Sequence, residues 1–266
     1  MAHNFETEYL RLIFEVLDRG ERKFDRTGIG TISSFGQNIK FDCSEEPPVL
    51  TMRKIFTKGV IGEYCAFMQG FTKNKDFKKF GCNYWEPWAD ENGNLGSIYG
   101  RQWRKFNEDS KGDQIKQLIK TAKKNPESRQ MVVTAWNPLQ IKEMALPPCF
   151  HSFQILINNN KLNIQVNQRS ADIMIGLPSD AILHYLLMLT LCKEIGTSPG
   201  LINFSIGDAH IYRNHLSKVY TFLESSKGNP GKILLKNYKN INNLCPDNFK
   251  HIDYNPGPNI KFEINI

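Results

Sequence analysis

The chain has 266 residues, of which 40% are hydrophobic and 23% charged, a composition typical of a globular protein with a hydrophobic core. No apolar run approaches the roughly 20 residues of a membrane span, and the N-terminal stretch mixes acidic with apolar residues, so we expect no membrane span, no signal peptide and a cytoplasmic location, in a host cell if the source is viral. The net charge of +7 comes from dispersed Lys and Arg. Without a dense basic run, anionic small ligands explain this charge better than nucleic acid does.

The apolar periodicity predicts one α/β (α+β) domain over residues 1–266, without repeats or linkers. Taken in chain order, the expected elements are a helix at 5–19 with Leu10, Ile13, Phe14 and Leu17 on one face, a strand at 30–41, helices at 59–69 and 113–124, a strand at 130–136, a hairpin of 151–158 with 161–168, a helix at 178–195, a strand at 201–206 and a helix around 211–224.

The six cysteines lie far apart and form no CxxC pair, which favours about five buried reduced thiols and argues against a metal site or a disulfide framework. Cys149, in LPPCFHSFQ, is the candidate exception, because two prolines rigidify its approach. A nucleophilic thiolate needs cationic neighbours, and Arg169 lies on the paired strand of the predicted hairpin. A structural cysteine and a nucleophile both remain open on these residues alone.

Two further segments carry side chains suited to a nucleotide. In QRSADIMIGLPSDAI, Arg169 and Ser170 could clamp a phosphate, with a surface salt bridge as the alternative for the arginine. Asp180 stands near a predicted helix start, where an N-cap is the alternative to a ligand contact. In GDAHIYRNH, His210 and Tyr212 could bind a sugar hydroxyl or form a satisfied core pair.

Seven motifs together, from about residue 20 to the C-terminus, resemble the thymidylate synthase family in the family's own order: DRTGIGTISSFG, WEPWADENGNLGSIYGRQWR, PESRQMVVTAWNP, LPPCFHSFQ, QRSADIMIGLP, GDAHIYRNH and YNPGPNIKFEINI. The resemblance implies a kinked mixed sheet flanked by helices, and a homodimer with the sheets packed back to back. It also implies that 5,10-methylenetetrahydrofolate supplies a one-carbon unit to C5 of a pyrimidine nucleoside monophosphate, with no metal.

The resemblance also implies roles for single residues. The catalytic groups would be Cys149, which adds to C6 of the base, with Glu63, Tyr99 and Asp180. The nucleotide would be held by Arg26, Arg169, Ser170, Gln168, Asp180, His210 and Tyr212, and by Arg129 from the partner chain. The folate would contact Asp172, Trp85, Trp88, Leu146, Gly176, Arg53 and Ile266.

Three departures from the family pattern concern the nucleotide. Asp180 replaces the Asn of a GLPFN-like turn, Phe150 replaces a His after the nucleophile, and Gln130 replaces the second arginine of an SRR pair. An ionised carboxylate only accepts hydrogen bonds, so it would oppose O4 of uracil and favour the amino group of cytosine. The same Asp is similar to the arrangement in phage deoxycytidylate hydroxymethylases.

We therefore expect a deoxycytidylate (dCMP) 5-hydroxymethyltransferase, in which water captures the methylene group. Reductive methylation of dCMP or dUMP is the alternative within the family, because NPGPNIKFEINI resembles a lid that excludes water. A nucleotide- or RNA-binding regulator without activity is a remote alternative, since pure binding would not need Cys149.

Overall fold

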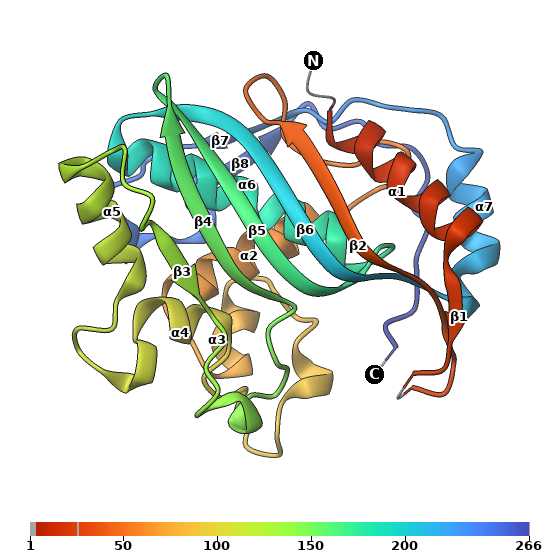
Figure 1. The fold of residues 1–266 in the computed structure, drawn as a ribbon, viewed down its shortest axis with the longest axis horizontal. Coiled ribbons are helices and arrows are strands. Elements are labelled where there is room, and N and C mark those ends of the chain that lie inside the picture. Colours follow the sequence, from red (N-terminus) through yellow and green to blue (C-terminus); the bar gives the residue numbers. More distant parts are fainter. Residues whose placement is uncertain (1–3, 26, 266) are drawn as a thin grey trace.

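The computed structural model describes residues 4–25 and 27–265. Its main feature is a six-stranded mixed sheet with the order β1-β2-β6-β5-β4-β3 (Figure 1). The strands are β1 (Glu21–Lys23), β2 (Thr31–Asp42), β3 (Val132–Thr134), β4 (Phe150–Asn158), β5 (Lys161–Asp172) and β6 (Ser198–Tyr212). β5 and β6 are parallel and the other neighbours antiparallel. A separate antiparallel pair joins β7 (Lys232–Leu235) to β8 (Phe249–Ile252).

The helices are α1 (Phe5–Arg19), α2 (Thr57–Met68), α3 (Asn74–Lys79), α4 (Tyr99–Arg104), α5 (Gln114–Lys124), α6 (Gly176–Ile195) and α7 (Leu216–Leu223). α6 is the β5–β6 crossover, and Figure 1 shows it behind the strands with α2. It ends at Gly196, whose φ of 88° is the left-handed conformation that glycine adopts without a Cβ penalty.

One face of the sheet is buried under helices. Phe204 of β6 packs edge-on against His184 of α6, and its ring also stacks on Phe41 of β2. Phe41 in turn contacts Phe5 of α1. Helices from the N-terminal and the C-terminal half of the chain therefore share one hydrophobic core with the sheet.

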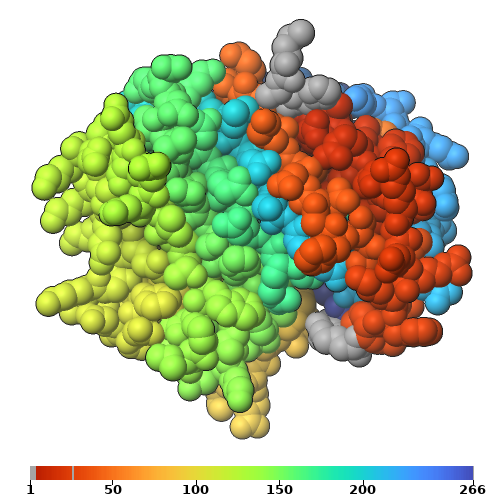
Figure 2. Space-filling view, viewed as in Figure 1, coloured from red at the N-terminus to blue at the C-terminus, as the bar shows by residue number. Residues whose placement is uncertain are grey.

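The opposite face of the sheet carries amides and hydroxyls. Asn203 donates to Gln165 across the parallel pair at 2.7 Å, and Asn167 donates to Ser152 at 3.1 Å. These side chains are partly exposed, and Figure 2 views the surface from this side, where the strands lie open between α1 and α5. Such a broad polar sheet face could pack against a second sheet.

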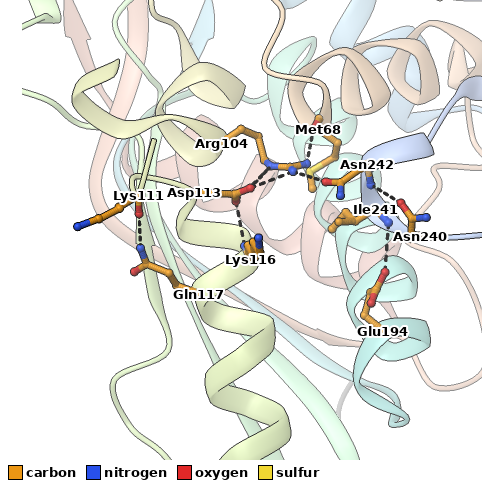
Figure 3. A network of polar contacts seen from close by, with 10 residues as sticks. All are labelled: Met68, Arg104, Lys111, Asp113, Lys116, Gln117, Glu194, Asn240, Ile241 and Asn242. Carbon is orange, nitrogen blue, oxygen red and sulfur yellow. Dashed lines mark hydrogen bonds and ion pairs between the residues drawn. The ribbon is translucent and has the colours of Figure 1, made fainter. Parts of the chain in front are cut away.

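A polar network joins the helices on the far side of the core to the C-terminal third of the chain (Figure 3). The Arg104 guanidinium pairs with Asp113 at 3.0 Å and donates to Met68 O and to Asn242 Oδ1. Nearby, Glu194 of α6 accepts from the Ile241 backbone at 3.1 Å. The network ties α2, α4, α5 and α6 to residues 240–242.

Most of the expected elements are confirmed, including the hairpin, whose β4–β5 register is antiparallel. The predicted face of α1 is confirmed for Ile13, which is fully buried, and for Leu10 and Leu17, which pack partly buried against the core, but it was wrong for Phe14, which is 56% exposed. The centre of the buried stripe is Tyr9, Leu12, Ile13 and Val16. Both sets have helical i, i+3, i+4, i+7 spacing, and the stripe with Tyr9 is buried because its hydroxyl reaches Ile173 O at 2.8 Å.

Three elements differ clearly from the predictions in their bounds. The strand expected at 130–136 is only Val132–Thr134, β6 is longer than predicted, and α7 begins only at Leu216, so that His210 and Tyr212 belong to β6. Four cysteines are buried, not five, because Cys245 is only partly buried. β1, α3, α4, β7 and β8 were not predicted.

Candidate functional site

The parallel strands β5 and β6 bring two of the predicted motifs side by side. Ser170 pairs in register with Asp208, and Asp172 with His210. Because carboxyl ends of parallel strands meet at one edge, the polar residues of QRSAD and GDAHIY lie together there. The Asp208 carboxylate accepts from Ser33, which adds β2 to the same edge. His210 packs edge-on against Tyr212 with 5.3 Å between ring centroids, and its buried Nδ1 has no hydrogen-bond partner within the described residues.

Cys149 lies just before β4, partly buried, and its backbone is held on both sides. Its carbonyl accepts from Arg169 N at 2.8 Å, and its N–H contacts the Tyr99 hydroxyl at 2.8 Å. The Arg169 guanidinium donates to the carbonyls of Pro147 and Pro148 at 2.9 and 3.0 Å. The expected approach of Arg169 to Cys149 is therefore confirmed.

Burial and nearby charges have opposing effects on the pKa of the Cys149 thiol. Burial raises the pKa of Cys149 above the usual thiol value, and the Arg169 guanidinium opposes that rise. The carboxylates of Asp180 and Asp172 also raise the pKa of the Cys149 thiol. Further positive charge is needed to make a thiolate at neutral pH.

Asp180 lies on the fifth residue of α6, so the N-cap alternative is wrong. Its Oδ2 accepts from Gln168 Nε2 at 2.7 Å. Burial raises the pKa of Asp180 to about 8, and the nearby carboxylates of Glu63 and Asp172 act in the same direction. The carboxyl is therefore largely neutral at pH 7, with one O–H donor and one acceptor oxygen.

Phe150 is buried between two rings, which explains how an apolar residue is accommodated beside the nucleophile. Its ring centroid lies 4.4 Å from that of Tyr99 and 4.8 Å from that of His184. Nδ1 of His184 lies 2.7 Å from Asp180 O, and burial lowers the pKa of His184 to about 4. His184 is therefore neutral, and its ring packs against Phe150 and contacts the backbone of Asp180.

Glu63 is a buried carboxylate of α2 that is held by two aromatic donors. Oε1 accepts from Trp85 Nε1 at 2.7 Å, and Oε2 accepts from the Tyr84 hydroxyl at 2.8 Å. Burial raises the pKa of Glu63 to about 7, while both hydrogen bonds lower it. Tyr84 was not predicted, because no spacing in the sequence indicates that its hydroxyl reaches a carboxylate 21 residues earlier.

A cavity of about 580 Å³ opens beside these groups, a volume within the usual range for small-ligand sites. Its walls combine apolar and aromatic side chains with three cations and the C-terminal tail, and they include Arg53, Lys54, Tyr84, Trp88, Ile175, Lys261 and Phe262. The guanidinium of Arg53 lies 5.1 Å from the ring centroid of Phe262 and donates to Met174 O.

The model of the family described as Thymidylate synthase matches residues 7–266. The chain belongs to the thymidylate synthase family. Membership makes it a one-carbon transferase that acts on a pyrimidine nucleotide, with methylenetetrahydrofolate as the carbon donor. The mixed sheet flanked by helices is the fold expected for this family.

The C-terminal tail of this thymidylate synthase family member closes over the cavity. Lys54 N donates to Pro258 O at 3.0 Å, and His215 Nε2 lies 2.8 Å from Glu263 O. His215 also acts on Asp172, whose pKa is raised by burial and lowered by the two nearby histidines. Asp172 accepts from Met174 N and Ile175 N, which fixes its carboxylate beside Ile175, a residue of the cavity wall.

Family members work as dimers, and the position of Arg129 in its own chain can be compared with that of Cys149. Its side chain is exposed, and its carbonyl accepts from Gln154, five residues along β4 from Cys149. At strand rise this separation is about 16 Å, more than an arginine side chain spans. The structure therefore does not bring Arg129 to the Cys149 of its own chain.

Of the four remaining predicted residues, the structure describes Leu146 and Gly176. Leu146 lies on the segment before Cys149, and Gly176 begins α6, where a Cβ would be 3.8 Å from Asp180 Oδ2. Arg26 and Ile266 lie outside the described residues.

Residues 4–25 and 27–265 contain no group of three or more His, Cys, Asp or Glu side chains that could hold a metal ion. In the same part of the chain, no helix is long and apolar enough to span a bilayer.

Proposed function

We propose that the enzyme is a deoxycytidylate 5-hydroxymethyltransferase. The observation that supports this proposal is the position of Asp180. Its carboxyl is a site group held by Gln168 and not a helix cap, and it lies within electrostatic range of Cys149, Glu63 and Asp172. A carboxyl at that place presents a different pattern of donors and acceptors from the family's amide.

The neutral carboxyl of Asp180 matches the cytosine edge. Its O–H can donate to N3, and its other oxygen can accept from the exocyclic amino group. When the thiolate adds to C6, N3 becomes more basic and takes this proton, and the resulting carboxylate still pairs with both groups. In its ionised form Asp180 would oppose O4 of uracil, another acceptor, and a mismatch of this kind costs about 1–3 kcal/mol, whereas the cytosine amino group suits both forms.

The nucleophile is Cys149, in agreement with the family resemblance. Addition of its thiolate to C6 pushes an electron pair to C5, which becomes nucleophilic. The pKa of this thiol is raised in the structure, so the bound substrate and neighbouring cations must favour the charged form. Arg169 supplies one cation, and we propose that Arg129 of a second chain supplies another.

The nucleotide is held at the joined ends of β5 and β6. Arg169 and Ser170 suit the phosphate, and His210 and Tyr212 suit the 3′-hydroxyl of the sugar. Nδ1 of His210 supports this assignment, because it approaches Asp208 Oδ1 only to 3.8 Å and makes no hydrogen bond within the described residues, which is costly for a buried polar atom until a ligand satisfies it.

The cavity suits a folate, which is flat, aromatic and anionic at one end. Trp88 and Phe262 offer aromatic surface, and Arg53, Lys54 and Lys261 offer positive charge. The folate supplies a carbon at the oxidation level of formaldehyde. Asp172, with its pKa raised by burial, can share a proton with a pterin nitrogen at the cavity edge.

The hydroxymethyl product requires water to add to the methylene carbon at C5. The balance is dCMP plus methylenetetrahydrofolate plus water giving 5-hydroxymethyl-dCMP plus tetrahydrofolate, with no net oxidation. One proton leaves C5 and the water loses another as it adds, while the two folate nitrogens that release the carbon take up two protons. Glu63, with a pKa of about 7, is suited to accept and return protons near neutral pH.

Reductive methylation is the second candidate, and the position of the C-terminal tail favours it. Residues 258–263 contact Lys54, Arg53 and His215 over the cavity, and such a cover would exclude water. The neutral form of Asp180 also leaves dUMP as an alternative substrate, because a carboxyl can accept from N3–H and donate to O4.

One experiment separates these reactions. The enzyme is incubated with methylenetetrahydrofolate and either dCMP or dUMP, and the masses of the nucleotide products are determined by mass spectrometry. A hydroxymethyl product from dCMP supports the proposal. A methyl product from either nucleotide, or conversion of dUMP in preference to dCMP, would replace it with the second candidate.

A further inference from the structure

The packing at the start of α2 brings Tyr84 onto the helix face that carries Glu63. A Cβ at Gly59 would lie 2.5 Å from the ring of Phe56 and 3.2 Å from Cε1 of Tyr84. Only the absence of a side chain at this position lets both rings lie against the first turn of the helix. Glu63 follows Gly59 by four residues, hence on the same face one turn later.

From this position Tyr84 contacts Glu63 through its hydroxyl and also forms part of the cavity wall. It donates to Glu63 Oε2 at 2.8 Å, and Tyr84 is one of the residues that line the cavity. Trp85 holds the other carboxylate oxygen at 2.7 Å. Two donors on two different oxygens fix the plane of the carboxylate as well as its position.

We propose that Tyr84 is a positioning residue for proton transfer by Glu63: its hydroxyl orients the carboxylate and connects it to the ligand cavity. This inference rests on the role of Glu63 in the proposed function. It adds a residue that the family motifs in this sequence did not indicate.

The physical reason is that a hydrogen bond to a carboxylate stabilises the ionised form. Burial raises the pKa of Glu63, and the hydrogen bond from Tyr84, together with that from Trp85, lowers it. Burial raises the pKa of Tyr84 itself, so the phenol keeps its proton and remains a donor. Its oxygen lone pairs can accept a hydrogen bond from water or a ligand in the cavity.

The test is Tyr84→Phe, which removes the hydroxyl and retains the ring. The pKa of Glu63 is measured without turnover, from isotope-labelled glutamate carboxyl resonances, with the Glu63 signal assigned by its loss in Glu63→Gln. We expect the pKa to rise by about one unit, as for the loss of one charge-assisted hydrogen bond. The apparent pKa of the acid limb in the pH profile of kcat/KM should rise by the same amount. Activity should therefore fall about fivefold at pH 7 and little at pH 9.

Tyr238→Phe is the matched control, because the Tyr238 hydroxyl also donates to a glutamate, Glu194, at 2.6 Å, away from the cavity. This control should leave both the Glu63 titration and the pH profile unchanged. An unmoved Glu63 pKa in Tyr84→Phe, or an equal change in both variants, would overturn the proposal. If dCMP is not converted, the proposed substrate is wrong, while the titration still decides the role of Tyr84.

Discussion

Asp180 and Gln168 are joined by a hydrogen bond of 2.7 Å between the carboxyl Oδ2 and the amide Nε2. Gln168 is itself buried, and its Oε1 has no partner within the described residues. The strand β5 therefore fixes the position of a carboxyl that belongs to α6. This contact makes Asp180 a rigid recognition group, and the predictions on substrate choice follow from it.

Replacing Asp180 by Asn should move substrate preference from dCMP toward dUMP. The wild-type enzyme should favour dCMP in kcat/KM by at least tenfold, or about 1.4 kcal/mol, and the variant should reduce or reverse this ratio. The change is expected to be incomplete, because Phe150 remains beside the nucleophile. Steady-state kinetics with both nucleotides measure it, and an unaltered ratio would show that Asp180 does not read the base.

The same substitution should have a pH-dependent effect on stability. Asp180 has a pKa of about 8 in the folded state and near 4 when unfolded, so between these values the unfolded chain binds fewer protons and stability falls as pH rises. Asn carries no such cost. The stability advantage of Asp180→Asn should therefore grow by up to about 1.4 kcal/mol per pH unit between pH 5 and 8. Urea unfolding of both proteins across this range measures the difference, and a constant difference would contradict the raised pKa.

Cys149→Ser and Cys149→Ala should abolish turnover and any covalent nucleotide adduct, because no other nucleophile lies at this position. Nucleotide binding should persist, since the phosphate and sugar contacts belong to β5 and β6. Product assays, intact-protein mass spectrometry and calorimetric titration measure the three properties. Appreciable product from Cys149→Ala would remove the basis of the mechanism.

Arg129 is predicted to act in the partner's site, so complementary inactive chains should restore activity when mixed. A hybrid of Arg129→Glu and Cys149→Ala chains has one site with both residues intact. If chains exchange at random, about a quarter of wild-type activity should return, because half the dimers are hybrid and each has one intact site. Demonstrated hybrid dimers without activity would exclude a shared site.

Glu6 supports the segment that carries Arg53 into the cavity wall. Its buried carboxylate accepts from Thr51 N at 2.6 Å, Thr51 Oγ1 at 2.7 Å and Met52 N at 2.9 Å. Glu6→Gln replaces the oxygen that accepts from Thr51 Oγ1 by an amide NH2 and removes the charge from all three hydrogen bonds, so it should lower the free energy of unfolding by about 1.5–3 kcal/mol. Glu15→Gln breaks only the exposed pair with Arg19, so it should cost less than about 1 kcal/mol in the same urea titration. Equal losses would contradict the role of Glu6.

The sequence by itself determined the family, the long elements and the main chemical groups. Helical periodicity and the turn at Asn158–Asn160 were enough for α1, α6 and the β4–β5 hairpin, because these depend on local pattern. The predicted hairpin also indicated that Arg169 could approach Cys149, because the two residues lie close to its paired strands. Motif order identified Cys149, because the chemistry requires a particular residue at a particular place.

Only the tertiary structure decided which helix face is buried and what environment each titratable group has. Local pattern did not distinguish the stripe of Tyr9 from that of Phe14, since both have helical spacing and only the partner surface selects one. Asp180 could be a cap or a ligand group until α6 was seen to begin four residues earlier. Tyr84 and Glu63 meet because Gly59 leaves space for a ring, and such a contact depends on shape in three dimensions, which spacing along the chain does not encode.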